Sequence, residues 1–109
     1  MNMENLEFTF ERGVLTSKIL GDIDHHSAKH VREKIDSYIV GCKPALFFLD
    51  LSAVDFMDSS GLGLILGRLN TAQEIGAEMR IYSPSRSVKK ILELAGIERL
   101  IKIEGELRV

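Results

Sequence analysis

The segment Asp58-Ser59-Ser60-Gly61 holds the side chains best suited to chemistry, because it places two hydroxyls where a loop is expected to turn into a helix. Asp58 and Ser59 are both favoured helix N-caps, since their side-chain oxygens can accept the first unpaired backbone N–H groups. Gly61 and Gly63 leave the backbone there open to close approach. A helix start carries roughly half a positive charge, so this site favours an anion, either a bound phosphate or a phosphate attached to a serine.

Known phosphate and nucleophile motifs do not fit this segment. A dinucleotide fingerprint needs G-x-G-x-x-G, whereas Gly61, Gly63 and Gly67 are spaced G-x-G-x-x-x-G. A phosphate loop ends in Gly-Lys-Ser/Thr, and no Lys or Arg occurs from Pro44 to Gly67. A hydrolase nucleophile elbow needs a glycine where Asp58 stands. We therefore interpret the glycines as allowing close packing of a helix on a sheet, with simple helix capping as the alternative role of the polar residues.

A second polar cluster precedes the first expected helix and is a candidate metal site. It consists of Asp22, Asp24, His25 and His26. No further ligand group at metal spacing occurs elsewhere in the sequence, so we predict neither a metal nor a cofactor. The favoured interpretation is a turn and helix entry, in which Asp24 places negative charge near the helix N-terminus.

A receiver-type phosphotransfer domain is another candidate function, with Asp50 or Asp55 as the phosphate acceptor. Such a domain needs an acidic pair after its first strand and a lysine after its last, whereas this chain is expected to open with a hairpin. This function, or a small nucleotide-binding domain, remains the alternative prediction.

Hydrophobic periodicity predicts five strands around these segments. Leu6, Phe8 and Phe10 alternate with polar residues, as in a strand with one buried face. The continuous apolar run Ala45–Leu49 predicts a central strand buried on both faces. The five strands are expected at Leu6–Phe10, Val14–Leu20, Ala45–Leu49, Met79–Tyr82 and Ile101–Ile103.

Helical spacing of apolar residues predicts three helices. The first begins at about Ser27, the second follows the paired serines, and the third begins at Pro84-Ser85. Gly41 is expected to end the first helix in the left-handed conformation, and Gly76 and Gly96 are expected to end the others. The residues expected to face the sheet are Ala28, Val31, Ile35, Tyr38, Ile39, Leu62, Ile65, Leu66, Leu69, Ala72, Val88, Ile91, Leu92 and Ala95.

The element order β-β-α-β-α-β-α-β predicts an α/β fold in a single domain, residues 1–109. Its small, mostly parallel sheet opens with an antiparallel hairpin, and a sheet of this size can carry its helices on one face. The 109 residues have a formal net charge of −2, which argues against direct nucleic-acid binding. The single cysteine, Cys42, and the lack of a signal or membrane-spanning stretch predict a cytoplasmic protein without membrane attachment.

The run from Val54 to Arg68 resembles the signature of bacterial anti-sigma factor antagonists with the STAS domain, of the sporulation type. The run Gly21-Asp22-Ile23-Asp24-His25-His26 resembles that family's loop before the first helix, and the expected element order also fits. The resemblance covers essentially the whole chain, although the last segment, Glu104–Val109, is short.

The resemblance implies a non-enzymatic switch. In this family the unphosphorylated protein binds an anti-sigma factor that is also an ATP-dependent serine kinase, and so frees the sigma factor. The kinase phosphorylates one serine at the start of the second helix, which releases the antagonist, and a serine phosphatase resets it. By position the phosphorylated residue is Ser59, while Ser60 stays unmodified. The implied partner-binding residues are Asp22, Asp24, His25, His26, Asp58, Ser59, Ser60 and Gly61.

The charges of the serine segment predict how such a switch works. Phosphoserine adds about −1.5 to −2 charges. Asp50, Asp55 and Asp58 are already negative, and the absence of basic residues between Pro44 and Gly67 predicts no local arginine clamp. We therefore expect phosphorylation to act at the partner interface rather than by refolding the domain.

Overall fold

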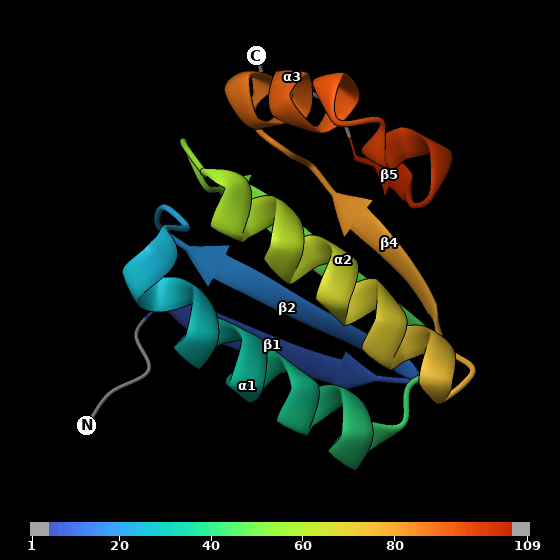
Figure 1. Ribbon diagram of the computed structural model, residues 1–109. Coiled ribbons are helices and arrows are strands. Elements are labelled where there is room, and N and C mark those ends of the chain that lie inside the picture. Colours follow the sequence, from blue (N-terminus) through green and yellow to red (C-terminus); the bar gives the residue numbers. More distant parts are fainter. Residues whose placement is uncertain (1–4, 106–109) are drawn as a thin grey trace.

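The computed structural model describes residues 5–105, which form one five-stranded sheet with helices packed on it (Figure 1). Both the α/β class and the expected element order are confirmed. The elements along the chain are β1 (Leu6–Glu11), β2 (Val14–Leu20), α1 (His25–Cys42), β3 (Leu46–Ala53), α2 (Ser59–Glu74), β4 (Glu78–Tyr82), α3 (Arg86–Leu94), the 3₁₀ helix η1 (Ile97–Arg99) and β5 (Lys102–Glu104).

The strands lie in the order β1-β2-β3-β4-β5. β1 and β2 form the expected antiparallel hairpin, whose turn residues Arg12 and Gly13 both have positive φ angles, 52° and 79°. β2, β3, β4 and β5 are parallel to one another. Parallel neighbours need crossover connections, which α1, α2 and α3 supply.

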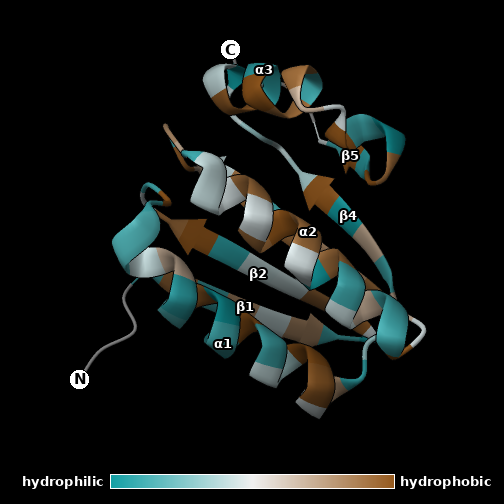
Figure 2. Ribbon diagram, in the orientation of Figure 1, coloured by the Kyte–Doolittle hydropathy of each residue, from teal (hydrophilic) through white to brown (hydrophobic). Residues whose placement is uncertain are grey.

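α1 and α2 lie across the same face of the sheet, and the core fills the space between these layers (Figure 1). α3 lies at the β4–β5 side of the sheet, away from α1. Phe47 and Leu49 of β3 are fully buried in this core. Ile35 and Ile39 of α1 are fully buried in it as well. The outer surface of α1 is mostly hydrophilic, as expected for an amphipathic helix (Figure 2).

The prediction that the central strand is buried on both faces is wrong. Burial alternates along β3, with Phe47 buried while Leu46 and Phe48 are only half-buried. On the uncovered face, a shallow hollow of about 240 Å³ is lined by strand residues, including Phe48 and Tyr82, whose rings meet edge to face. On this face, Phe48 of the apolar run therefore packs against a ring of the neighbouring strand rather than under a helix.

α1 differs from its expected bounds at both ends. It begins at His25 because Asp24 caps it, and it continues through Gly41, so the prediction that Gly41 ends the helix is wrong. Lys43 takes the left-handed position instead, with φ 49°, and its N–H donates to the carbonyl of Ile39. The turn falls there because Ala45 must reach the β1–β2 turn, where its N–H donates to the Gly13 carbonyl at 2.8 Å. Gly76 and Gly96 do adopt positive φ, as expected.

Candidate functional site

The helix α2 begins at the first of the two serines. Asp58 is its N-cap, and its Oδ1 accepts the backbone N–H of Ser60 at 2.8 Å. The Asp58 carbonyl accepts the N–H of Gly61 at 2.9 Å. Ser59 is therefore the first helical residue rather than the cap, and its exposed hydroxyl forms no hydrogen bond within residues 5–105.

The glycines at this helix start have different roles. A Cβ on Gly61 would lie 2.7 Å from the Cβ of Met57, so the missing side chain makes room for that buried methionine. A Cβ on Gly63 or Gly67 would have no neighbour within 4 Å. The close-packing interpretation is therefore correct for Gly61 and wrong for Gly63 and Gly67, which face open space.

The polar loop before α1 lies directly beside the loop before α2. Ile23 and Met57 form a parallel bridge, and the Ile23 N–H donates to the Phe56 carbonyl at 3.2 Å. One carboxylate oxygen of Asp22 accepts the backbone N–H groups of Asp55 and Phe56, at 3.2 and 3.0 Å. The structure thus brings together the two segments on which the sequence analysis depended, and Asp22 holds them in place.

The other side of the loop before α2 is held by the start of α3. The hydroxyl of Ser85 donates to the carbonyl of Val54 at 2.9 Å, and the hydroxyl of Ser87 donates to the carbonyl of Asp55 at 2.8 Å. The sequence identified Ser85 only as a helix start and gave no signal for Ser87, because both contacts join residues more than 30 positions apart. The backbone that leads into Ser59 is therefore fixed from two directions.

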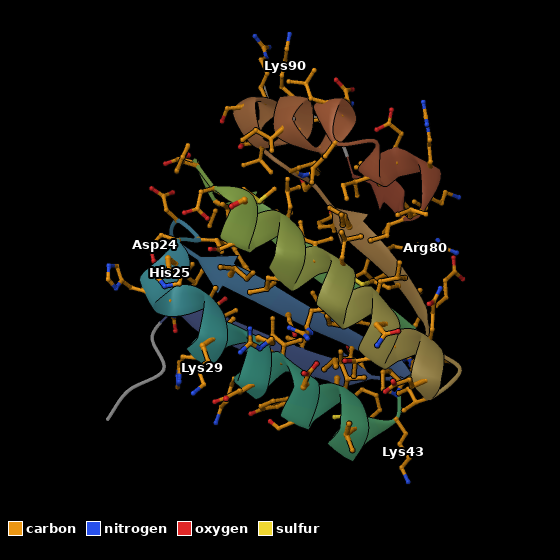
Figure 3. All side chains as sticks on the ribbon, viewed as in Figure 1. Asp24, His25, Lys29, Lys43, Arg80 and Lys90 are labelled. Atoms are coloured by element: carbon orange, nitrogen blue, oxygen red, sulfur yellow. The ribbon has the colours of Figure 1, made fainter. Side chains whose placement is uncertain are left out.

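Asp24 caps α1, and His25 and His26 are its first two residues. Figure 3 shows Asp24 and His25 together at this end of the helix. Asp24 accepts the N–H groups of His26 and Ser27 at 2.9 and 3.0 Å, and the bond from the Ser27 backbone is the main reason why the pKa of Asp24 is lowered. His25 and His26 are exposed, with ring centroids 6.0 Å apart. Within residues 5–105, no three His, Cys, Asp or Glu side chains are grouped to hold a metal.

Asp50, a candidate acceptor for the receiver-type alternative, lies apart from this site. Its side chain lines the hollow on the uncovered face of the sheet, and its carboxylate accepts the N–H of Ser52 at 2.9 Å. Asp55 is exposed in the loop before α2. Within the described part of the chain, no helix is long and apolar enough to cross a membrane.

Replacing Asp22 tests its role in fixing the serine loop. Asp22→Ala is expected to lower the stability by about 1–2 kcal/mol, because two backbone donors lose a charged acceptor. Asp22→Asn keeps an acceptor oxygen and should lose less. The measurement is thermal unfolding combined with amide hydrogen exchange at Asp55 and Phe56. Equal exchange rates in wild type and Asp22→Ala would contradict the assigned role.

Comparisons with known proteins agree with this fold. The family model described as the STAS domain matches residues 5–108. The anti-sigma F factor antagonist of Paenibacillus polymyxa is 35% identical over 103 residues, which cover 94% of this chain and 87% of that protein. The anti-sigma-B factor antagonist of Listeria monocytogenes is 29% identical over 92 residues, which cover 82% and 80% of the two chains.

Among solved structures, the anti-sigma factor antagonist SpoIIAA in its unphosphorylated form is similar over 93% of this chain and 89% of its own, with a TM-score of 0.78 and 25% identity. The family match over residues 5–108 therefore agrees with the observed fold, which is a five-stranded sheet that opens with a hairpin and carries three helices. This chain belongs to the STAS domain family.

Proposed function

We propose that this protein is an anti-sigma factor antagonist, and that phosphorylation of Ser59 switches off its binding to the anti-sigma factor. The relatives named above support the first part, since each carries that description. Anti-sigma factor antagonists regulate by binding rather than by catalysis. The proposed partners are an anti-sigma factor with ATP-dependent serine kinase activity and a serine phosphatase that restores the unmodified form.

The exposure of the Ser59 hydroxyl is the observation that carries the switch. It is the first residue of α2 and makes no hydrogen bond within residues 5–105, so a kinase need not break an existing contact to use it. Ser60 differs, because its side chain is half-buried and lines the space between α1 and α2. This difference favours Ser59 over Ser60 as the acceptor.

The proposed partner surface is the end of the molecule where the starts of α1 and α2 meet. Asp22 and Asp58 have backbone-holding roles there, whereas the exposed rings of His25 and His26 are free to contact a partner. The backbone of Gly61 belongs to the same end of α2. The proposed partner-binding residues are Asp22, Asp24, His25, His26, Asp58, Ser59, Ser60 and Gly61.

Labelling by the cognate kinase tests the proposal. Ser59→Ala is expected to abolish incorporation of phosphate, while Ser60→Ala keeps Ser59 available and is still labelled. The measurement is phosphate incorporation from ATP, with tandem mass spectrometry to locate the site. Phosphate found on Ser60 of the wild type would show that the assignment is wrong.

The same assay separates the proposal from the phosphotransfer alternative. Incubation with ATP or acetyl phosphate in the absence of any kinase should leave the protein unmodified. Self-labelling of Asp50 or Asp55 under these conditions would favour a receiver-type function instead.

A further inference from the structure

A groove of about 460 Å³ lies between α1 and α2, and Ser60, the residue after the proposed phosphorylation site, lines it. The α2 side of this groove carries no charge, whereas the α1 side presents basic groups one turn apart. The lining residues that matter here are Ser60 and Gly63 from α2, and His25, Lys29 and Arg32 from α1.

Ser59 directly precedes Ser60, one of the residues that line this groove. It precedes Gly63 by four residues and therefore lies in the same row of α2, one turn closer to the N-terminus. Helical side chains lean towards the N-terminus, so the space that a side chain of residue 63 would fill adjoins Ser59. A Cβ at Gly63 would meet no atom within 4 Å, so a phosphate on Ser59 can extend into this space.

Two basic side chains of the groove, Lys29 and Arg32, are not neutralised by an ion pair within residues 5–105. Both side chains are exposed. The carboxylate at the α1–α2 contact, Asp36, already pairs with Arg68 Nε at 2.8 Å. Burial is the main cause of the lowered pKa of Arg68, and the positive charge of Arg32 also lowers it.

We propose that the phosphate of phosphorylated Ser59 is held in this groove by Arg32, with Lys29 and His25 beside it. This inference rests on Ser59 being the modified residue. It also replaces the expectation that the chain offers no local arginine clamp, because α1 supplies the cation that residues 44–67 lack. The carboxylates of Asp24 and Asp58 oppose the phosphate, but both are engaged by backbone N–H groups at their own helix starts.

The consequence is a phosphorylated form with an internal partner for its phosphate. The contact lowers the free energy of the released state, and it occupies His25, one of the residues proposed to bind the anti-sigma factor. The fold itself need not change, because Arg32 and Lys29 are long, exposed side chains that can reorient.

The test measures the second pKa of the phosphoserine by phosphorus NMR. Phosphoserine is inserted at position 59 during translation, so no kinase is needed. A nearby cation lowers this pKa, which is about 6 in the absence of such contacts. Arg32→Gln should raise it by about 0.5 relative to the wild type, a roughly threefold change in proton affinity. Arg99→Gln, which removes the same charge from η1, is the matched control and should leave it unchanged.

A titration of Arg32→Gln that superimposes on the wild type would overturn the proposal. Arg32→Lys should retain part of the wild-type shift, because it keeps the charge without the planar guanidinium. The unphosphorylated Arg32→Gln protein should melt like the wild type, which excludes a folding defect. Failure of the kinase to label Ser59 would disprove the proposed function but would leave this titration result unaffected.

Discussion

Phosphorylation of Ser59 is expected to weaken binding of the anti-sigma factor by more than a hundredfold, with little change in the stability of the free protein. A phosphate of about −1.5 to −2 charges at a surface that binds a neutral hydroxyl must lose its water to enter the interface, which costs far more than leaving it exposed. A loss of about 3 kcal/mol of binding free energy corresponds to more than a hundredfold in Kd. Ser59→Asp adds one charge and should weaken binding less than the phosphate does.

The stability of the phosphorylated protein should stay near that of the unmodified protein. An anion at a helix N-terminus is typically favourable by about 0.3–1 kcal/mol, while repulsion from Asp58 acts in the opposite direction. A net change of about 1 kcal/mol would shift the melting temperature of a domain of this size by only about 4–8 °C.

A thermal melt and a calorimetric titration with the anti-sigma factor, both on the same phosphorylated sample, check these two expectations. Binding that survives phosphorylation would rule out an interface switch. A melting temperature that falls by tens of degrees would instead indicate that phosphorylation unfolds the domain.

The sequence was sufficient for the features that depend on local pattern. The hairpin, the order of elements, and the buried stripe of α1 at Ala28, Val31, Ile35 and Ile39 are all confirmed. Each follows from a period of two or of about 3.6 residues, which the chain shows without reference to distant parts. The role of Asp58 as a helix cap is likewise a local property.

The hydrophobic pattern did not correctly predict which residues of α2 are buried. Leu66 was expected to face the sheet but is 40% exposed, whereas Arg68 was not expected in the interior and is only 4% exposed. The face of α2 is set by two neighbours, since it packs against both the sheet and α1. Arg68 is buried because Asp36 of α1 lies 2.8 Å from its Nε, a pairing between residues distant in sequence.

The candidate site shows the same division between local and distant contacts. The sequence identified the serine segment and the loop at Asp22, but not the way that the contacts of Asp22, Ser85 and Ser87 hold the segment. Nor could it place Lys29 and Arg32 of α1 in one groove with Ser60 of α2, because their spacing is also typical of a helix face exposed to solvent. The position of α1 relative to α2, which decides between these roles, is a property of the assembled core.

The glycines of α2 give a second large effect, in which the same substitution should act in opposite directions two residues apart. Gly61→Ala places a methyl group 2.7 Å from the Met57 Cβ and 2.8 Å from its sulfur, so Met57 or the helix start must shift. Such overpacking typically costs about 1–3 kcal/mol. Met57 is buried and forms the bridge to Ile23, so the shift should also disturb the backbone before Ser59.

Gly63→Ala is the matched control, because its Cβ would meet nothing within 4 Å. Replacing a helical glycine by alanine at an open position stabilises by about 0.5–1 kcal/mol. Thermal melts of the two variants should therefore move to either side of the wild type, with Gly61→Ala lower and Gly63→Ala higher. The fall should also be the larger change, since strain against a buried side chain exceeds the gain in helix propensity. If both variants instead melted above the wild type, Gly61 would be shown to serve no packing role, and its place beside Ser59 would need a different physical cause.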